Sequence, residues 1–196
     1  MHPELQLYPS QPMRIYSVPS ELGRVQEDGR RKGPPWIVQI KKNGHRAIVR
    51  CAGYEDPVCI YSRHGDPLTA AKGKDWDWLK DVFVPPFVLD GELVGPRQAG
   101  SEHKLCLWDM ILHDGESMLA WPYLQRKIAI TEMSPVSAGL SCETYPFGRW
   151  QELWDSITDP DGPDEGLVFK RGDVAIPWHP RPNVENATML KLRKKG

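Results

Sequence analysis

The sequence lacks an excess of charge of either sign. Its 25 lysines and arginines face 26 aspartates and glutamates, so the formal net charge is −1. This balance excludes a protein that binds nucleic acid through a basic field over its whole surface, and any such binding requires a local patch. The four cysteines are scattered without a C-x-x-C spacing, which argues against a zinc module and predicts reduced thiols.

Long apolar runs are missing as well. The N-terminal stretch "MHPELQLYPS" has neither the basic start nor the apolar core of a signal peptide. No segment approaches the length of a membrane span. We therefore expect a soluble, cytoplasmic protein with no membrane partner. Its 196 residues, 40% hydrophobic and 26% charged, fit one globular domain.

Short strand-like runs dominate what is present. They are rich in branched and aromatic residues and bounded by turn formers, and they lie at 36–41, 46–51, 57–62, 87–94, 104–111, 166–171 and 188–193. Helical patterns are fewer, and they lie at 75–83, 121–133 and 148–157, with a loop at 158–166. Residues 1–35 are rich in proline, glycine and charge and are expected to form an irregular lead-in. The mixture predicts the α+β class.

The stretch "WIVQIKKNGHRAIV" interrupts an alternating strand pattern with an Asn-Gly pair. Asn43 and Gly44 between two such runs predict a hairpin. Lys41, at the end of the first run, would present its amine at a rigid place, as a nucleophilic lysine requires. An ordinary lysine is protonated at neutral pH, so this reading requires other cations to converge on the amine. A surface lysine beside a turn is the ordinary alternative.

The stretch "VLDGELVG" places acidic residues inside an apolar run. Val88, Asp90 and Glu92 share one face of a strand by period-two counting. An Asp-Gly pair there indicates a bulge or the close approach of a ligand. Glu92 could accept hydrogen bonds from a ribose or hold a metal-bound water. An edge strand with a solvated acidic face would explain the pattern equally well.

Three further stretches are ambiguous when taken singly. Trp108 in "LCLWDMIL" suits either the core or a platform on which a base stacks. Glu165 precedes a strand containing Lys170 and could coordinate Mg²⁺. Lys191 and Arg193 share a face of the last strand, where they could hold a phosphate or form a solvated tail.

Taken in order, these stretches resemble the motif set of the covalent nucleotidyltransferases, which comprise DNA ligases, RNA ligases and mRNA capping enzymes. The order is Lys-x-Asn-Gly-x-Arg, Asp-Gly-Glu, Trp-Asp, Glu-Gly-x-Val-x-Lys and Lys-x-Arg, from about Trp36 to Lys194. The segment "YSRHGDPLT" is similar to the Ser-Arg-x-Gly segment of ATP-dependent DNA ligases, particularly small viral or phage types. The resemblance implies an α+β adenylyltransferase fold, with two antiparallel sheets, flanking helices and a nucleotide cleft between the sheets.

The resemblance also implies roles around the nucleotide. Lys41 would attack the α-phosphate of ATP, release pyrophosphate and hold AMP as lysyl-AMP. Gln39 and Ile40 would contact the nucleotide, with Gln39 at the adenine edge, and Trp108 would stack on the base where Phe or Tyr is usual. Arg46 would bind around the ribose and reach toward the nick.

The remaining implied roles concern phosphate and metal. Glu92 would join the ribose contacts and, with Glu165, would organise Mg²⁺. Arg63 would bind the 5′-phosphate of the nick. Three cations would approach the phosphates and favour the neutral amine of the nucleophile: Lys170, Lys191 and Arg193.

The implied partner is a nicked duplex, DNA rather than RNA, in repair, replication or recombination. AMP would pass to the 5′-phosphate, and the neighbouring 3′-hydroxyl would displace it. Candidate backbone contacts are residues 30–32, Lys42, Arg50 and the tail at 193–195. An RNA ligase, a capping enzyme that takes GMP, and a binding module that does not seal remain alternatives.

Three departures from the family pattern accompany the resemblance. Asn43 stands where DNA ligases usually have Asp, and Arg193 stands where Lys is usual. No OB-fold domain follows "KLRKKG", so we expect one nucleotidyltransferase domain over 1–196. It would be a monomer, either a truncated domain or a minimal enzyme, for which a protein partner could supply the OB-fold contacts.

Overall fold

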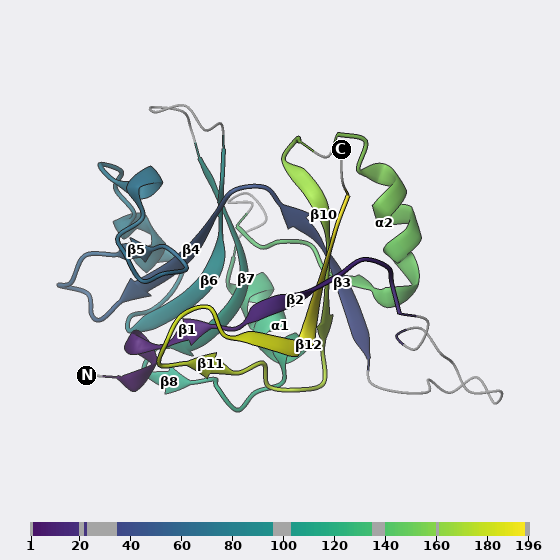
Figure 1. The fold of residues 1–196 in the computed structure, drawn as a ribbon. Coiled ribbons are helices and arrows are strands. Elements are labelled where there is room, and N and C mark those ends of the chain that lie inside the picture. The colour runs from purple at the N-terminus through teal and green to yellow at the C-terminus, as the bar shows by residue number, and fades with distance from the viewer. Residues whose placement is uncertain are drawn as a thin grey trace.

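The computed structural model describes residues 2–19, 22, 35–95, 103–134, 140–159 and 161–194. Two five-stranded sheets form most of the fold, and β1 (Tyr8–Pro9) pairs with β11 (Trp178–His179) in a small third sheet (Figure 1). The predicted α+β class is confirmed. Within the described ranges, no helix is both long enough and apolar enough to cross a membrane.

The first sheet combines strands from near both ends of the described chain. Its strand order is β2 (Gln11–Ile15), β12 (Glu185–Arg193), β10 (Asp164–Arg171), β3 (Trp36–Lys42) and β9 (Tyr145–Pro146). All pairs are antiparallel except β12 and β2, which run parallel. The expected antiparallel pairing therefore holds apart from this one pair. The expectation for the lead-in is wrong, because it contains strands β1 and β2 and a 3-10 helix (η1, Pro3–Gln6) rather than irregular chain alone.

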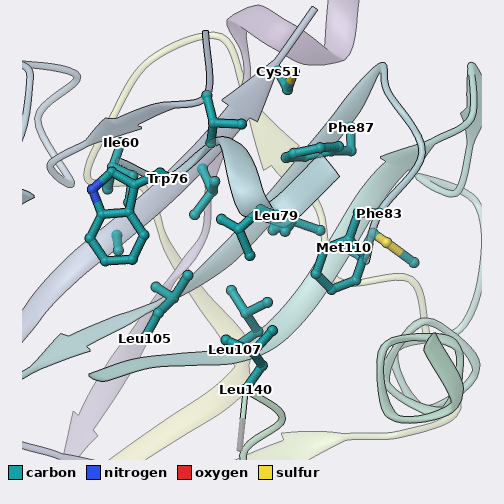
Figure 2. Packing of buried hydrophobic residues seen from close by; sticks show 14 of the residues in the cluster. Cys51, Ile60, Trp76, Leu79, Phe83, Phe87, Leu105, Leu107, Met110 and Leu140 are labelled. Atoms are coloured by element: carbon teal, nitrogen blue, oxygen red, sulfur yellow. The ribbon is translucent and has the colours of Figure 1, made fainter. Parts of the chain in front are cut away.

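The second sheet is antiparallel throughout. Its order is β5 (Cys59–Tyr61), β4 (His45–Cys51), β6 (Phe87–Val94), β7 (Lys104–His113) and β8 (Glu116–Ser117). Apolar residues on one face of β4, β6 and β7 pack beneath the segment 68–83, where Trp76, Leu79 and Phe83 lie over the sheet (Figure 2). Because side chains alternate along a strand, the other face carries the remaining residues of these strands.

The helices are few, and each packs against a strand inside one of the two sheets. The predicted helix at 121–133 is α1 (Tyr123–Met133), with Pro122 at its N-cap. The predicted helix at 148–157 is α2 (Trp150–Ser156), preceded by a 3-10 turn, η6 (Phe147–Arg149). Figure 1 shows α2 beside β10 and β3, where Leu153 joins their apolar cluster.

Two expected elements differ from the prediction. The stretch 75–83, predicted as a helix, contains only a short 3-10 helix, η4 (Asp77–Asp81). A second 3-10 helix, η3 (Thr69–Ala71), lies upstream of it. The cis peptide bond between Pro85 and Pro86 follows η4, and proline cannot continue a helix. The loop predicted at 158–166 ends early, because β10 begins at Asp164.

The predicted hairpin at Asn43–Gly44 is also wrong. Strand β3 before it pairs with β10 and β9, whereas β4 after it pairs with β5 and β6 in the other sheet. The Asn43 N–H donates to the carbonyl oxygen of Pro163 at 2.8 Å, and its side-chain amide donates to that of Gly162 at 3.0 Å. A side chain on Gly44 would clash with the carbonyl of Leu93. The Asn-Gly pair is therefore the crossing from one sheet to the other.

Candidate active site

A cleft of about 750 Å³ lies between the two sheets, next to this crossing. Both sheets and the loop after β5 contribute to its lining. All the site residues predicted from the sequence line it: Gln39, Ile40, Lys41, Arg46, Arg63, Glu92, Trp108, Glu165, Lys170, Lys191 and Arg193. The structure thus brings together residues that are up to 154 positions apart, from Gln39 to Arg193.

The first sheet arranges its cleft residues in rows across neighbouring strands. One row runs from Lys41 on β3 through Gly166 on β10 to Arg193 on β12. A side chain at Gly166 would clash with the carbonyl of Leu192, so glycine allows β12 to approach β10 closely beside Lys41. The amine and the guanidinium therefore lie on one face, two strands apart.

A second, parallel row lies one side-chain step along the strands. It runs from Gln39 through Val168 and Lys191 to Arg14 on the edge strand β2. All four residues line the cleft. The row therefore leads from the residue predicted to read adenine to a pair of cations at the far edge of the sheet.

Lys41 and its neighbour Lys42 have different partners, because successive side chains of a strand point to opposite faces. The Lys41 amine is ion-paired to Glu165, and the Arg193 guanidinium lies 3.2 Å from the same carboxylate oxygen. Lys42 instead donates to Asp164 at 2.7 Å. Since only Lys41 shares its carboxylate with a second cation, its surroundings differ from those of an ordinary surface lysine.

Two of the three cations predicted to approach the phosphates, Lys191 and Arg193, lie near Lys41, whereas the third, Lys170, donates to Tyr123. Burial lowers the pKa of Lys191, and the charges of Lys41, Arg193 and Arg63 act in the same direction against the opposing charge of Glu185. These cations are therefore close enough to repel one another. Such a cluster favours an anion between its members.

The second sheet supplies the opposite wall through a buried carboxylate, Asp90, which is 2% exposed. Arg46 donates two hydrogen bonds to Asp90, each 2.5 Å, and the indole N–H of Trp108 donates a third at 2.7 Å. Burial opposes the charge on Arg46, but Asp90 outweighs burial and raises the pKa of the guanidinium. The half-buried Trp108 ring, 5.4 Å from that guanidinium, is thereby fixed as a surface of the cleft.

A hydrogen-bond network lies behind this surface. The buried Lys170 amine donates to the Tyr123 hydroxyl at 2.9 Å and lies 5.5 Å from the centre of the Trp108 ring. The Tyr123 hydroxyl donates to the Trp108 carbonyl at 2.6 Å and lies 3.3 Å from Gln39. The Gln39 amide donates to Thr144 at 2.8 Å, so its orientation is set before any ligand binds. Burial lowers the pKa of Lys170 to about 7.

Glu92 lies in a central strand, so the alternative of a solvated edge strand is wrong. Strand β6 runs between β4 and β7, with a register shift at Asp90–Gly91, and a side chain at Gly91 would clash with the Cys106 carbonyl. Burial raises the pKa of Glu92 to about 7, and Asp90 and Glu165 add to this against Lys41 and Arg46. Because the charge of Glu165 acts on Glu92, the two carboxylates lie near each other in the same cleft.

These two carboxylates fit a magnesium site of modest size. Among the described residues, no group of three or more histidine, cysteine or acidic side chains lies close enough to hold a metal by itself. Mg²⁺ commonly uses one or two carboxylates and completes its shell with waters and substrate phosphates. Glu165 and Glu92 beside a phosphate-binding cluster match that requirement.

The candidate nucleic-acid contacts are only partly available. Arg50 donates to the Leu7 carbonyl at 2.8 Å and lies between the rings of Tyr8 and Tyr61, and Lys194 donates to the Trp154 carbonyl at 2.7 Å. Residues 30–32 and residue 195 lie outside the described residues. Arg63, in contrast, lines the cleft and donates to the neighbouring ring of His64 at 3.0 Å.

Sequence reasoning missed several residues of the site. The cleft is also lined by Gln11, Pro12 and Arg14 from β2, a strand that was not expected. The alternation of apolar Met13 and Ile15 with polar residues was the available signal, but it is short and interrupted by prolines. Tyr123 carried no signal, because its hydroxyl acts through tertiary contacts alone.

Comparison with known proteins agrees with this geometry. The family model described as "ATP dependent DNA ligase domain" matches residues 20–103. The DNA ligase-like protein LigB derived from the SPbeta prophage of Bacillus subtilis is 26% identical over 116 residues, which are 50% of this chain and 41% of the relative. The chain thus spans less than half of that relative.

Two solved structures share the fold. Mycobacterial DNA ligase D, in complex with ATP, has a TM-score of 0.70 and 17% identity, covering 98% of this chain and 62% of that one. The ATP-dependent DNA ligase of bacteriophage T7 has a TM-score of 0.59 and 16% identity, covering 96% and 69%. The sequence match to the ATP-dependent DNA ligase domain thus extends over residues 20–103, and nearly the whole chain shares the fold of these DNA ligase structures.

Proposed function

We propose that this domain carries out the nucleotidyl-transfer and sealing steps of an ATP-dependent polynucleotide ligase, with a nick in DNA as its substrate. The observation that carries the proposal is the position of the Lys41 amine. It lies in a cleft between the sheets, beside a cluster of cations and in the same cleft as the fixed ring of Trp108. A nucleotide with its base on Trp108 would direct its phosphates toward that cluster.

In the first step, the Lys41 nitrogen attacks the α-phosphorus of ATP. A phosphorus–nitrogen bond forms and the bond to pyrophosphate breaks. The amine must lose a proton, and the nearest base is Glu165, its ion-pair partner. Lys191, Arg193 and the buried Lys170 stabilise the charge that develops on the phosphoryl oxygens.

In the second step, the phosphorus–nitrogen bond breaks and AMP passes to the 5′-phosphate of the nick. The 3′-hydroxyl then attacks that phosphate, forms the phosphodiester and releases AMP. Arg63, at the mouth of the cleft, binds the 5′-phosphate in this scheme. Glu165 and Glu92 would hold Mg²⁺, which neutralises phosphate charge when bound.

The residues around the base and ribose position the nucleotide. Trp108 stacks on the adenine, and Gln39, whose amide is held by Thr144, meets its edge together with Ile40. Arg46 and Glu92 lie where the ribose would follow. Since Arg46 is already held by Asp90, little ordering of these groups is needed on binding.

Two alternatives rest on specific observations. The crossing residue Asn43 stands where DNA ligases usually have Asp, which favours testing RNA as well as DNA. The ion pair between Lys41 and Glu165 also suits a module that binds nucleotide or nicked nucleic acid without sealing, because a paired amine is not nucleophilic.

The deciding experiment is intact-mass measurement after incubation with ATP and Mg²⁺. The wild-type protein should gain the mass of one AMP, and peptide mapping should place it on Lys41 rather than Lys42. Lys41→Arg, which keeps the charge, should gain nothing, whereas Lys80→Ala, outside the cleft, should behave as wild type. Absence of any adduct, together with failure to seal a pre-adenylylated nick in DNA or RNA, would overturn the proposal.

A further inference from the structure

A second cluster of charge lies at the edge of the cleft that β2 forms. Arg14 on β2 is in register with Lys191 on β12, so the two side chains occupy adjacent positions on the same face. Arg63 approaches from the loop after β5, close enough for its charge to act on Lys191. All three line the cleft.

These three cations differ from three others that line the cleft. Lys41, Arg46 and Arg193 each lie within ion-pair distance of a carboxylate. In the part of the chain that the structure describes, no ion pair within 4.0 Å is recorded for Arg14, Arg63 or Lys191. The Arg14 guanidinium lies 5.0 Å from the centre of the Tyr16 ring instead, and Glu185 is the carboxylate that lines this end of the cleft. The cluster therefore carries three cations against the single nearby carboxylate of Glu185, which leaves an excess of positive charge.

Arg14 is also far from the position of the α-phosphate. It lies three strands from β3, which carries Lys41, and strands are spaced about 4.8 Å apart, so their backbones are separated by roughly 14 Å. A phosphate bound directly over Arg14 would therefore be a different one from the phosphate that Lys41 attacks. One guanidinium group can donate two hydrogen bonds to two oxygens of the same phosphate, which suits it to a terminal phosphate.

We propose that Arg14, with Lys191 and Arg63, forms a subsite for a phosphate group beyond the α-phosphate, and that Arg14 is a binding residue of this enzyme. The inference rests on the proposed function. Two ligands offer this chemistry, namely the β- and γ-phosphates of ATP and the 5′-phosphate at the nick. Strand β2 thereby contributes a functional group as well as an edge to the sheet.

Binding measurements in the Lys41→Ala background separate these ligands without any turnover. One arm measures dissociation constants for ATP and AMP, whose ratio isolates the β- and γ-phosphates. The other arm compares nicked duplexes with a 5′-phosphate and a 5′-hydroxyl. Adding Arg14→Ala should reduce one or both ratios by about 10- to 100-fold, as expected for loss of charge-assisted hydrogen bonds, and Arg14→Lys should restore part of the loss.

The controls separate this inference from the proposed function. Arg149→Ala removes an exposed arginine outside the cleft and should leave both ratios unchanged. Arg14 is itself exposed, so its loss should not alter thermal unfolding. A fall in the ATP ratio assigns the subsite to the triphosphate, and a fall in the nick ratio assigns it to nucleic acid. Unchanged ratios in both arms overturn the inference, whereas a wild-type protein that neither forms lysyl-AMP nor seals a pre-adenylylated nick overturns the function alone.

Discussion

The amine of Lys41 and the carboxylate of Glu165 form an ion pair between neighbouring strands β3 and β10. The pair places the proposed nucleophile beside its proposed proton acceptor. It also means that Glu165 must change partners when the nucleotide binds. This relationship leads to the first of four predictions.

Replacing Glu165 by Gln should slow lysyl-AMP formation by about 100-fold or more, because the amide neither accepts the proton nor holds a cation. The rate of mass gain with ATP and Mg²⁺ measures this. Glu152→Gln on α2, an exposed carboxylate outside the cleft, is the matched control. An undiminished rate in Glu165→Gln would show that the carboxylate has no role in lysyl-AMP formation.

Asp90 should be needed for stability as well as for the site. Asp90→Ala leaves Arg46 charged in a buried place and frees the Trp108 N–H, so we expect the free energy of unfolding to fall by about 3 to 5 kcal/mol. Asp90→Asn keeps one acceptor and should lose less. Urea unfolding measures both, with exposed Asp155→Asn as a control; a loss below about 1 kcal/mol in Asp90→Ala would contradict the prediction.

Lys170 should make stability depend on pH above neutrality. Its pKa is about 7 in the folded protein and near the ordinary 10.5 when unfolded, so the unfolded chain binds more protons between these values. The free energy of unfolding contributed by Lys170 therefore rises with pH from about 7 to 10.5, by up to about 1.4 kcal/mol per pH unit, and is flat below pH 7. Lys170→Met should abolish this slope, whereas exposed Lys72→Met should retain it. Identical slopes in all three proteins would show that the amine is charged in the fold.

Gly91 should tolerate no side chain. Gly91→Ala places a methyl group against the Cys106 carbonyl between two central strands, so we expect a loss of about 1 to 3 kcal/mol in the free energy of unfolding and weaker nucleotide binding through displaced Glu92. Gly148→Ala, where the added carbon meets nothing within 4 Å, should change stability by less than about 0.5 kcal/mol. Equal stability of the two variants would contradict the prediction.

The local pattern of the sequence was enough to locate most strands and all the cleft residues that the motifs contain. It failed at Asn43–Gly44, because hairpin rules consider only the two flanking runs. The partner of β3 is β10, more than 120 positions away, and Pro163 and Gly162 accept the hydrogen bonds of Asn43. Contacts between distant parts of the chain therefore decide which sheet each of the two strands joins.

The same limit explains the missed strand β2. Among the described strands it pairs with β12 alone, in parallel, and such pairing between distant parts of the chain leaves no local signature. Pro12 is tolerated because β2 is an edge strand. Arg14 is part of no motif, so its place beside Lys191 follows only from the fold.

The row from Gln39 through Val168 and Lys191 to Arg14 crosses four strands, two from near the start of the chain and two from near its end. A nucleotide lying along that row would span the seams between these strands. Its binding energy would add directly to the cohesion of the sheet, since a ligand that binds only the folded form shifts the folding equilibrium toward it. The pairing of β2 with β12 lies at the edge of the sheet and would be stabilised most. Nucleotide binding should therefore slow the hydrogen exchange of backbone amides in both strands.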